Sequence, residues 1–178
     1  MNARMGSACI DLQPVLIGHL IELRPLTPED YEPLFQVAND PLIWEQHPSP
    51  LRYQRDIFDS QIFSSGLASK TTLVVVDKQT SKIIGSSRYY DVNSVSRELA
   101  IGFTFLARTY WGGVINREIK SLMLAHAFTW ANRIWFHVAC QNIRSCKALE
   151  KIGAVLSHTS KRAVNGQPVE HHFYFINS

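Results

Sequence analysis

Arg108-Thr-Tyr-Trp-Gly-Gly-Val-Ile-Asn116 is the stretch of this sequence that decides its fold. It follows an alternating apolar segment, Glu98–Leu106, and leads into a long amphipathic one, 114–132. This order predicts a strand, a turn through two glycines and a helix. The first N–H groups of a helix have no partners within it and lie at its positive end, and glycine lets a ligand approach them closely. The turn is therefore suited to bind an anion such as phosphate, although a tight turn can need glycine for its backbone angles alone.

The segments on either side of this unit predict a mixed sheet with helices packed on it. Their order along the chain is β α α β β β α β α β β, which is typical of an α+β fold, that is, an α/β mixed sheet. Asn165-Gly166 between the last two strands is a strong hairpin signal. The predicted strands are 20–24, 71–76, 82–90, 98–106, 134–139, 154–160 and 170–176, and the predicted helices are 27–39, 54–64, 114–132 and 142–152.

Length and composition indicate a globular domain. The chain has 178 residues, of which 46% are apolar, and we expect one domain over 15–178 after an N-terminal tail over 1–14. The net charge of +3 is spread along the chain, which is weak support for binding nucleic acid. Cys9, Cys140 and Cys146 show no paired spacing, which favours free thiols in a cytoplasmic protein over a disulfide framework or a metal site. No apolar stretch reaches the ~20 residues of a membrane helix.

Four motifs in register resemble the GNAT N-acetyltransferase superfamily, nearest to the branch that includes the ribosomal-protein N-terminal acetyltransferases. They span roughly residues 18–176 in the family's order. The resemblance implies a GNAT-like fold with about seven mostly antiparallel strands and about four helices on both faces. The motifs are Ile21-Glu-Leu-Arg-Pro-Leu-Thr-Pro-Glu-Asp30, Ala100-Ile-Gly-Phe-Thr-Phe-Leu106, Tyr110-Trp-Gly-Gly-Val-Ile-Asn-Arg-Glu118, and Asn142-Ile-Arg-Ser145 with Glu150-Lys-Ile-Gly-Ala154.

The resemblance implies acetyl-CoA as cosubstrate and no metal. The strand before the turn would pair with the pantetheine arm as an added strand, through Thr104, Phe105 and Leu106. Asn142 and Ser145 would lie against the pantetheine or phosphate region. Backbone amides of the turn would hold the pyrophosphate, and the residues concerned are Tyr110, Trp111, Gly112, Gly113, Val114, Asn116 and Arg117.

Three positions depart from the family pattern. Val114 stands where glycine or alanine is usual, although its backbone N–H survives the change. Leu149 stands where many members carry the tyrosine that protonates the leaving thiolate. Ala100 stands where many carry a glutamate. The sequence therefore supports cofactor binding more strongly than it supports catalysis.

Acetyl transfer to an amine requires that the amine be neutral and that the thiolate be stabilised as it leaves. Glu98 lies on the same strand face as Ala100, about 7 Å away along the strand, and is the predicted base acting through water. The alternative is a surface glutamate paired with Arg97 or Arg88. Ser145 is the predicted proton donor to the thiolate, and its alternative is a helix-start hydroxyl. A backbone N–H near Thr104 is the candidate donor to the developing oxyanion.

The predicted function is transfer of an acetyl group from acetyl-CoA to a primary amine, by direct attack in a ternary complex. The amine belongs to a small molecule or to a protein N-terminus. A catalytically weak acyl-CoA-binding or regulatory module is the alternative. We expect a monomer or homodimer, with neither nucleic acid nor membrane as a partner. The segments that would shape the acceptor site, 29–39, 54–64 and 91–96, carry no residue set specific to one amine.

Overall fold

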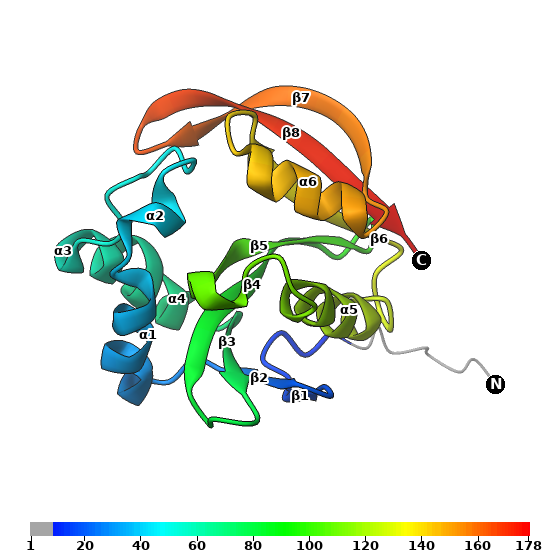
Figure 1. Cartoon of the computed structure of the whole chain (residues 1–178). Coiled ribbons are helices and arrows are strands. Elements are labelled where there is room, and N and C mark those ends of the chain that lie inside the picture. The colour runs from blue at the N-terminus through cyan, green and yellow to red at the C-terminus, as the bar shows by residue number, and fades with distance from the viewer. Residues whose placement is uncertain (1–8) are drawn as a thin grey trace.

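An eight-stranded sheet runs through residues 9–178, which are the residues that the computed structural model describes (Figure 1). The strand order is β1-β2-β3-β4-β5-β6-β8-β7, and every neighbouring pair is antiparallel except β5 and β6, which are parallel. The mixed sheet predicted from the sequence is thus confirmed. The strands are β1 Leu16–Ile17, β2 Ile21–Pro25, β3 Thr72–Asp77, β4 Ile83–Asn93, β5 Glu98–Leu106, β6 Arg133–Ala139, β7 Val155–Val164 and β8 Gln167–Asn177.

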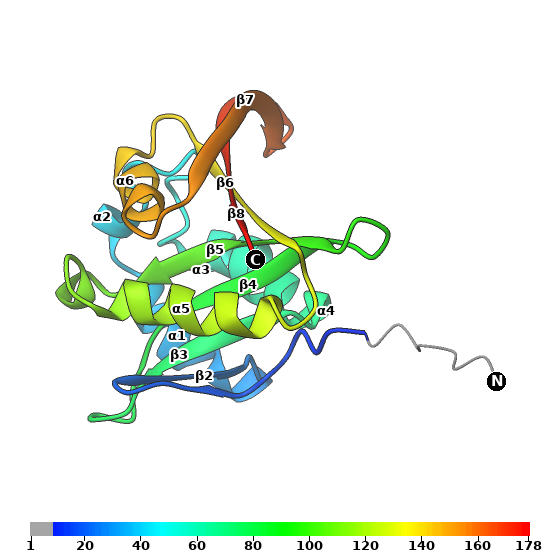
Figure 2. The ribbon, with the colours of Figure 1, turned by 90° about the vertical axis from the view of Figure 1, so that its right-hand side faces the viewer.

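Helices cover both faces of the sheet, and each face has its own apolar core (Figures 1 and 2). On one face lie α5, Ile115–Ala127, and α6, Ile143–Lys151. The α5 stripe buries Ile119 and Met123 against the sheet because residues four apart share one side of a helix. The other face is covered by α1 Tyr31–Ala38, α2 Pro41–Trp44, α3 Arg55–Phe58 and α4 Ser65–Ser69. Strand β3 is buried on both faces, which explains its unbroken apolar run, Leu73-Val-Val-Val76.

The element boundaries differ from the predicted ones in identifiable ways. Strand β1 and helix α2 were not predicted, since both are too short to carry a period. Pro41 begins α2 rather than only ending the helix before it, because proline suits the first helical position and Asp40 accepts a hydrogen bond from Leu42 N at 3.1 Å. The predicted helix over 54–64 continues to Ser69 through a π-helical segment, Asp59–Ser64. The predicted helix over 114–132 ends instead at Ala127.

The predicted N-terminal tail falls partly on residues 1–8, which lie outside the described residues. From Ile10 onward the chain contacts the α5 side of the molecule. Ile10 is buried in that core, and the Asp11 carbonyl oxygen lies 2.6 Å from His126 Nε2 on α5. Within residues 9–178, none of the helices has the length and apolar character needed to cross a membrane.

Candidate active site

The sheet splits between its two parallel strands. Strands β5 and β6 pair only from Glu98 to Ala100, opposite Arg133 to Trp135. Beyond this point β6 leaves β5 and runs on to Ala139, still paired with β8 on its other edge (Figures 1 and 2). The split leaves Ile101–Leu106 with an unpaired edge that faces the diverging β6. A strand edge of this kind can pair with an extended ligand.

A β-bulge shapes that edge. On β4, Ser86 and Arg88 pair with Phe105 and Gly102, so β5 carries one extra residue between them. Phe103 lies in the bulge with φ of 52°, an uncommon conformation for a non-glycine residue. The extra residue reverses which side chains point to which face. Ile101 belongs to the α5-side core, whereas Phe105 joins the core under α1–α4.

Two adjoining cavities of about 180 Å³ each occupy the split. We call the first the strand-gap cavity; its walls include β5 from Ile101 to Thr104 and β6 from Phe136 to Ala139. We call the second the turn-side cavity; its walls include the end of β5, residues 110–112 and the start of α6. The residues that line both are Trp44, His47, Thr104, Asn116, Asn142, Ser145 and Ala148.

Most of the residues predicted to bind the cofactor lie together at these cavities. Gly113 and Val114 instead line a separate hollow on the other side of the turn, and Arg117 lines neither cavity. The turn-side cavity is lined by nine of the twelve predicted residues, namely Thr104, Phe105, Leu106, Tyr110, Trp111, Gly112, Asn116, Asn142 and Ser145.

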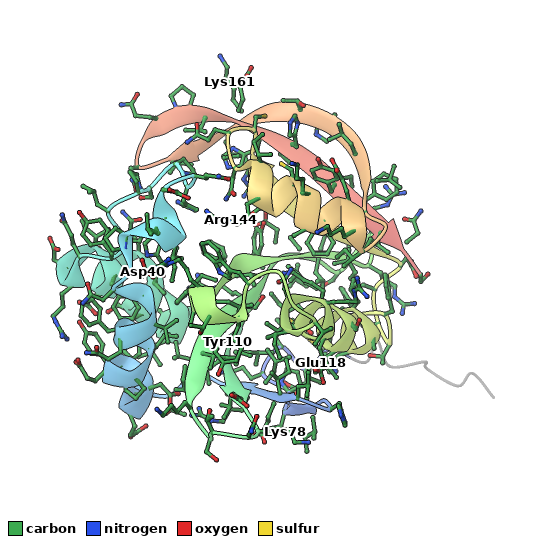
Figure 3. All side chains as sticks on the ribbon, in the orientation of Figure 1. Asp40, Lys78, Tyr110, Glu118, Arg144 and Lys161 are labelled. Carbon is green, nitrogen blue, oxygen red and sulfur yellow. The ribbon has the colours of Figure 1, made fainter. Side chains whose placement is uncertain are left out.

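The glycine turn is fixed from both sides. The Trp111 indole donates a hydrogen bond to the Leu106 carbonyl oxygen at 3.0 Å, and the Tyr110 hydroxyl donates to Asp77 at 2.7 Å. Arg144 of α6 places its guanidinium 3.9 Å from the centre of the Trp111 ring; Figure 3 shows Arg144 and Tyr110. Gly112 has φ of +71°, and a side chain there would meet no atom within 4 Å. The turn is therefore open above its backbone, as an anion-binding turn must be.

Helix α6 brings its first turn to both cavities. Asn142 caps it by accepting a hydrogen bond from Ser145 N at 3.3 Å, so the side chain is held at the helix start. Ser145 lines both cavities, and Leu149 lines the strand-gap cavity one turn later. Leu149 offers no proton to a leaving group, whereas the Ser145 hydroxyl can.

Lys120 is a buried amine that lines the strand-gap cavity. It projects from α5 and donates a hydrogen bond to Thr104 Oγ1 at 2.7 Å, and its ammonium lies 5.6 Å from the centre of the Phe136 ring. No carboxylate lies within ion-pair distance of it among residues 9–178. Burial lowers the pKa of Lys120 to about 7, so its charge changes near neutral pH.

The loop before α3 supplies a second cation, Arg52. Its Nε donates to Gln61 Oε1 at 3.0 Å, and its Nη1 lies 3.1 Å from His47 Nε2. Burial, and Arg52 after it, lower the pKa of His47 to about 3, so this imidazole is neutral at physiological pH. His47 and Arg52 both line the strand-gap cavity.

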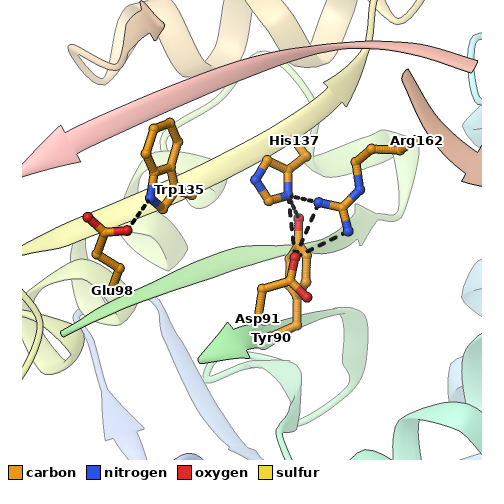
Figure 4. Close-up of polar contacts among 6 residues, drawn as sticks. All are labelled: Tyr90, Asp91, Glu98, Trp135, His137 and Arg162. Carbon is orange, nitrogen blue, oxygen red and sulfur yellow. Dashed lines mark hydrogen bonds and ion pairs between the residues drawn. The ribbon is translucent and has the colours of Figure 1, made fainter. Parts of the chain in front are cut away.

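His137 on β6 also lines the strand-gap cavity, and Figure 4 shows its polar contacts. Its Nδ1 lies 2.7 Å from Arg162 Nη1 and 2.9 Å from the Tyr90 hydroxyl, and Arg162 is also paired with Asp91 at 3.2 Å. Because a guanidinium can only donate, Nδ1 accepts and the proton of the neutral ring is assigned to Nε2. Burial, and Arg162 after it, lower the pKa of His137 to about 4. His137 is thus neutral rather than a base, and Nε2–H is its remaining donor.

Glu98 lies at the closed end of the split, where β5 and β6 still pair (Figure 4). Its carboxylate accepts a hydrogen bond from Trp135 Nε1 at 3.1 Å and lies 3.9 Å from Arg133 Nη1. It lines neither cavity. The structure therefore brings Ser145, but not Glu98, to the cavity walls, and a base role for Glu98 stays a prediction that requires a water relay.

Sequence reasoning missed Lys120, His47 and Arg52. Lys120 had a usable signal, because it lies four residues after Asn116 and helical spacing places the two on one side of α5. His47 and Arg52 had none, since they lie in a segment without periodicity that reaches the site only through tertiary packing.

A further hollow lies apart from the site. This hollow of about 880 Å³ opens beside α1 and shares no lining residue with either cavity. It is bounded by polar side chains that are already paired, Arg24 with Asp30 and Arg108 with Asp40. Residues 9–178 contain no group of three or more His, Cys, Asp or Glu side chains placed to hold a metal ion.

Solved structures similar to this one are acetyltransferases. A probable GNAT-family acetyltransferase from Chromobacterium violaceum is 21% identical, with a TM-score of 0.84 over 99% of this chain and 92% of that one. A candidate ribosomal-protein-serine acetyltransferase from Vibrio cholerae is 14% identical, with a TM-score of 0.76 over 95% and 100%. Spermidine N-acetyltransferase from Vibrio cholerae, in complex with CoA and spermine, is 20% identical, with a TM-score of 0.67 over 89% and 95%. At these identities the likeness is one of fold.

No curated protein matches the sequence. The family model described as the acetyltransferase (GNAT) domain, however, matches residues 21–155, which is most of the chain. That span contains the split between β5 and β6, the glycine turn and the start of α6. The chain therefore belongs to the GNAT family and is an acetyl-CoA-dependent N-acetyltransferase.

Proposed function

We propose that acetyl-CoA lies along the split, with its pyrophosphate on the turn from Gly112 to Asn116 and its pantetheine arm against Thr104–Leu106. The amine acceptor then enters the strand-gap cavity from the side of His137. The observation that carries this proposal is the loss of β5–β6 pairing after Ala100, beside a turn whose backbone is open. Extended backbone at the strand edge and free N–H groups at the start of α5 suit an amide-rich arm and a diphosphate respectively.

The residues present fit this cosubstrate. The cavity walls next to β5 are apolar or neutral, with Trp44 and Phe105 packed 5.0 Å apart between ring centres, which suits the uncharged pantetheine arm. Arg144 lies against Trp111 of the glycine turn and can pair with phosphate oxygens. When bound, the cosubstrate supplies the activated acetyl group that the amine attacks.

For the proton that the thiolate needs, we propose Ser145. Its hydroxyl lies at the junction of the two cavities, where the thioester would lie if the pyrophosphate occupied the turn. We expect Ser145→Ala to lower kcat by about tenfold or more, with the Kd for acetyl-CoA little changed. Ser121→Ala, at an exposed serine on α5, is the matched control. An unchanged kcat in Ser145→Ala would remove Ser145 from this role.

For the acceptor, we propose a primary amine of a small molecule or the α-amine of a protein N-terminus, as in the ribosomal-protein branch that the sequence resembles. An α-amine has a pKa near ~8, against ~10.4 for a lysine-type amine, so it needs less help to become neutral. That difference matters here because no carboxylate lines either cavity among the described residues.

Titration calorimetry with acetyl-CoA, followed by free-thiol release with a panel of amines and peptides, tests the proposal. We expect saturable binding and thiol release with at least one peptide or small amine. No binding of acetyl-CoA would contradict the site, and binding without thiol release across the panel would contradict the acceptor classes. Glu98→Gln in the same assay tests the predicted base: a loss of turnover that is larger at neutral than at high pH supports it, and an equal loss at all pH values excludes it.

A further inference from the structure

The two cavities are lined by cations but by no anion. Among residues 9–178, neither lining contains an aspartate or a glutamate, whereas Arg52 and Lys120 line the strand-gap cavity and Arg144 lines the turn-side cavity. Charged side chains that are removed from water are normally paired with an opposite charge. Arg144 is paired with Glu45 at 3.7 Å, whereas Arg52 and Lys120 have no carboxylate within 4.0 Å among residues 9–178. The two cations of the strand-gap cavity therefore point to an anion that enters it.

Arg52 is the cation with a free edge in this space. Its Nε and Nη1 contact Gln61 and His47, but its Nη2 has no hydrogen-bond partner among the described residues. It also has no carboxylate within 4.0 Å in that part of the chain. Burial, and Arg88 after it, lower the pKa of Arg52 to about 10, which still leaves the guanidinium charged at neutral pH.

The position of Arg52 points to the acceptor rather than to the phosphates of acetyl-CoA. Arg52 lines only the strand-gap cavity, whereas Tyr110, Trp111 and Gly112 of the glycine turn line the turn-side cavity and not the strand-gap one. The turn already has Arg144 beside it, against Trp111. Arg52 shares its cavity instead with His137 and Phe103, neither of which lines the turn-side cavity.

We propose that the acceptor of this enzyme is an amine that also carries an anionic group, a carboxylate or a phosphate, and that Arg52 binds this group through its free Nη2. This inference rests on the proposed function, since it assigns the substrate class of the same site. A polyamine, which carries only positive charges, is a poor substrate for such a cavity. Arg52 is then the residue that determines specificity.

The same cations assist the reacting amine. Positive charge close to an ammonium group favours its neutral form, and the neutral form is the nucleophile. Arg52 therefore lowers the pKa of the bound amine without taking up its proton, and Lys120 adds to this effect in its charged form, below its own pKa of about 7. The acceptor ammonium can then lose its proton to solvent although no carboxylate lines the cavity.

Matched acceptor pairs test the proposal. Glycylglycine and glycylglycinamide differ in the charge of the far end, and O-phosphoethanolamine and ethanolamine form the phosphate pair; spermidine is the polycation. We expect the wild type to prefer the anionic member of at least one pair by about tenfold in kcat/KM, because charge-assisted hydrogen bonds to arginine are among the strongest. Arg52→Gln should abolish that preference and Arg52→Lys should keep part of it. Arg55→Gln, at an exposed arginine paired with Glu32 at 2.8 Å, is the matched control and should change nothing.

A binding experiment distinguishes a failure of this inference from a failure of the proposed function. N-acetylglycylglycine and its amide are titrated into the CoA complex of the wild type and of Arg52→Gln, with acetyl-CoA titrated in parallel. Tighter binding of the carboxylate that is lost in Arg52→Gln supports the anion site even if no amine is turned over. Equal kcat/KM within both pairs, a preference that persists in Arg52→Gln, or spermidine as the best acceptor would overturn it. A loss of affinity for acetyl-CoA in Arg52→Gln that is as large as the loss of affinity for N-acetylglycylglycine would also overturn the proposal.

Discussion

At the scale of single residues, Lys120 is the most unusual member of the site. It occupies a position on the inner side of α5, next to Ile119 and four residues before Leu124, where an apolar side chain would be expected. Its amine is buried with one hydrogen bond, to Thr104, and no carboxylate among the described residues. Holding a cation in such a place costs stability, and natural proteins tolerate that cost mainly at functional sites.

The stability of the protein should therefore depend on pH through Lys120. Its pKa is about 7 in the folded protein and near ~10.4 in an unfolded chain, so between these values the unfolded state binds more protons and the free energy of unfolding rises with pH. Lys120→Met should be more stable than the wild type by a few kcal/mol, on the order of ~1.4 per pKa unit, at and below pH 7. The difference should shrink toward pH 10. Urea denaturation at several pH values measures it, with Lys147→Met at an exposed position of α6 as the control. A difference that is constant with pH would contradict the burial of a titrating amine.

Gly112 allows a second prediction, because Gly166 provides a matched control. Both have positive φ, +71° and +76°, and in both an added side chain would meet no atom within 4 Å. Alanine at either position should thus cost about 1 kcal/mol of stability. Only Gly112→Ala should also weaken acetyl-CoA, by about fivefold or more, because Gly166 lies in the β7–β8 turn and lines neither cavity. Calorimetry on both variants checks this, and equal affinities would contradict a phosphate site at the turn.

At the scale of elements, the start of α6 combines a structural and a binding role in Asn142. Its side chain caps the helix and also lines both cavities. Asn142→Ala should lose about 1 kcal/mol of stability as well as acetyl-CoA affinity. Asn142→Asp keeps the cap, so it should retain stability but still weaken acetyl-CoA, since the carboxylate repels an anionic cosubstrate. The two variants are compared by denaturation and by calorimetry. Full affinity in Asn142→Asp would place the phosphates away from α6.

The elements also explain how far the sequence could predict the site. Strand β5 and helices α5 and α6 were predicted because their apolar periods are long and their ends carry glycine or a polar cap. The end of β5, the turn after it and the starts of α5 and α6 therefore supplied nine predicted cofactor residues that line one cavity. The bulge at Phe103 could not be predicted, because one extra residue leaves the alternating sequence pattern recognisable as a strand. It changes only which face of the sheet each side chain after it occupies.

At the scale of the whole molecule, the site exists because the sheet is joined only briefly at its centre. Strands β1–β5 form one half and β6, β8 and β7 the other, and the two halves pair directly at three residues of β5. Loops from distant parts of the chain close the opening. The Asn165 side chain, at the β7–β8 turn, donates to Ser49 at 2.8 Å, close in sequence to His47 and Arg52. Such contacts across more than a hundred residues leave no local pattern, which is why the cation lining was not foreseen.

Hydrogen exchange of backbone amides, with and without saturating acetyl-CoA, tests the central claim most directly. The account predicts slower exchange in two segments, the free edge of β5 from Ile101 to Leu106 and the start of α5 from Gly113 to Arg117, with β1 and β2 unchanged. Each segment contains residues that line the two cavities, and hydrogen bonds to a ligand remove backbone amides from water. Unchanged exchange in β5, or protection instead around the hollow beside α1, at residues 24–40 and 81–83, would contradict it.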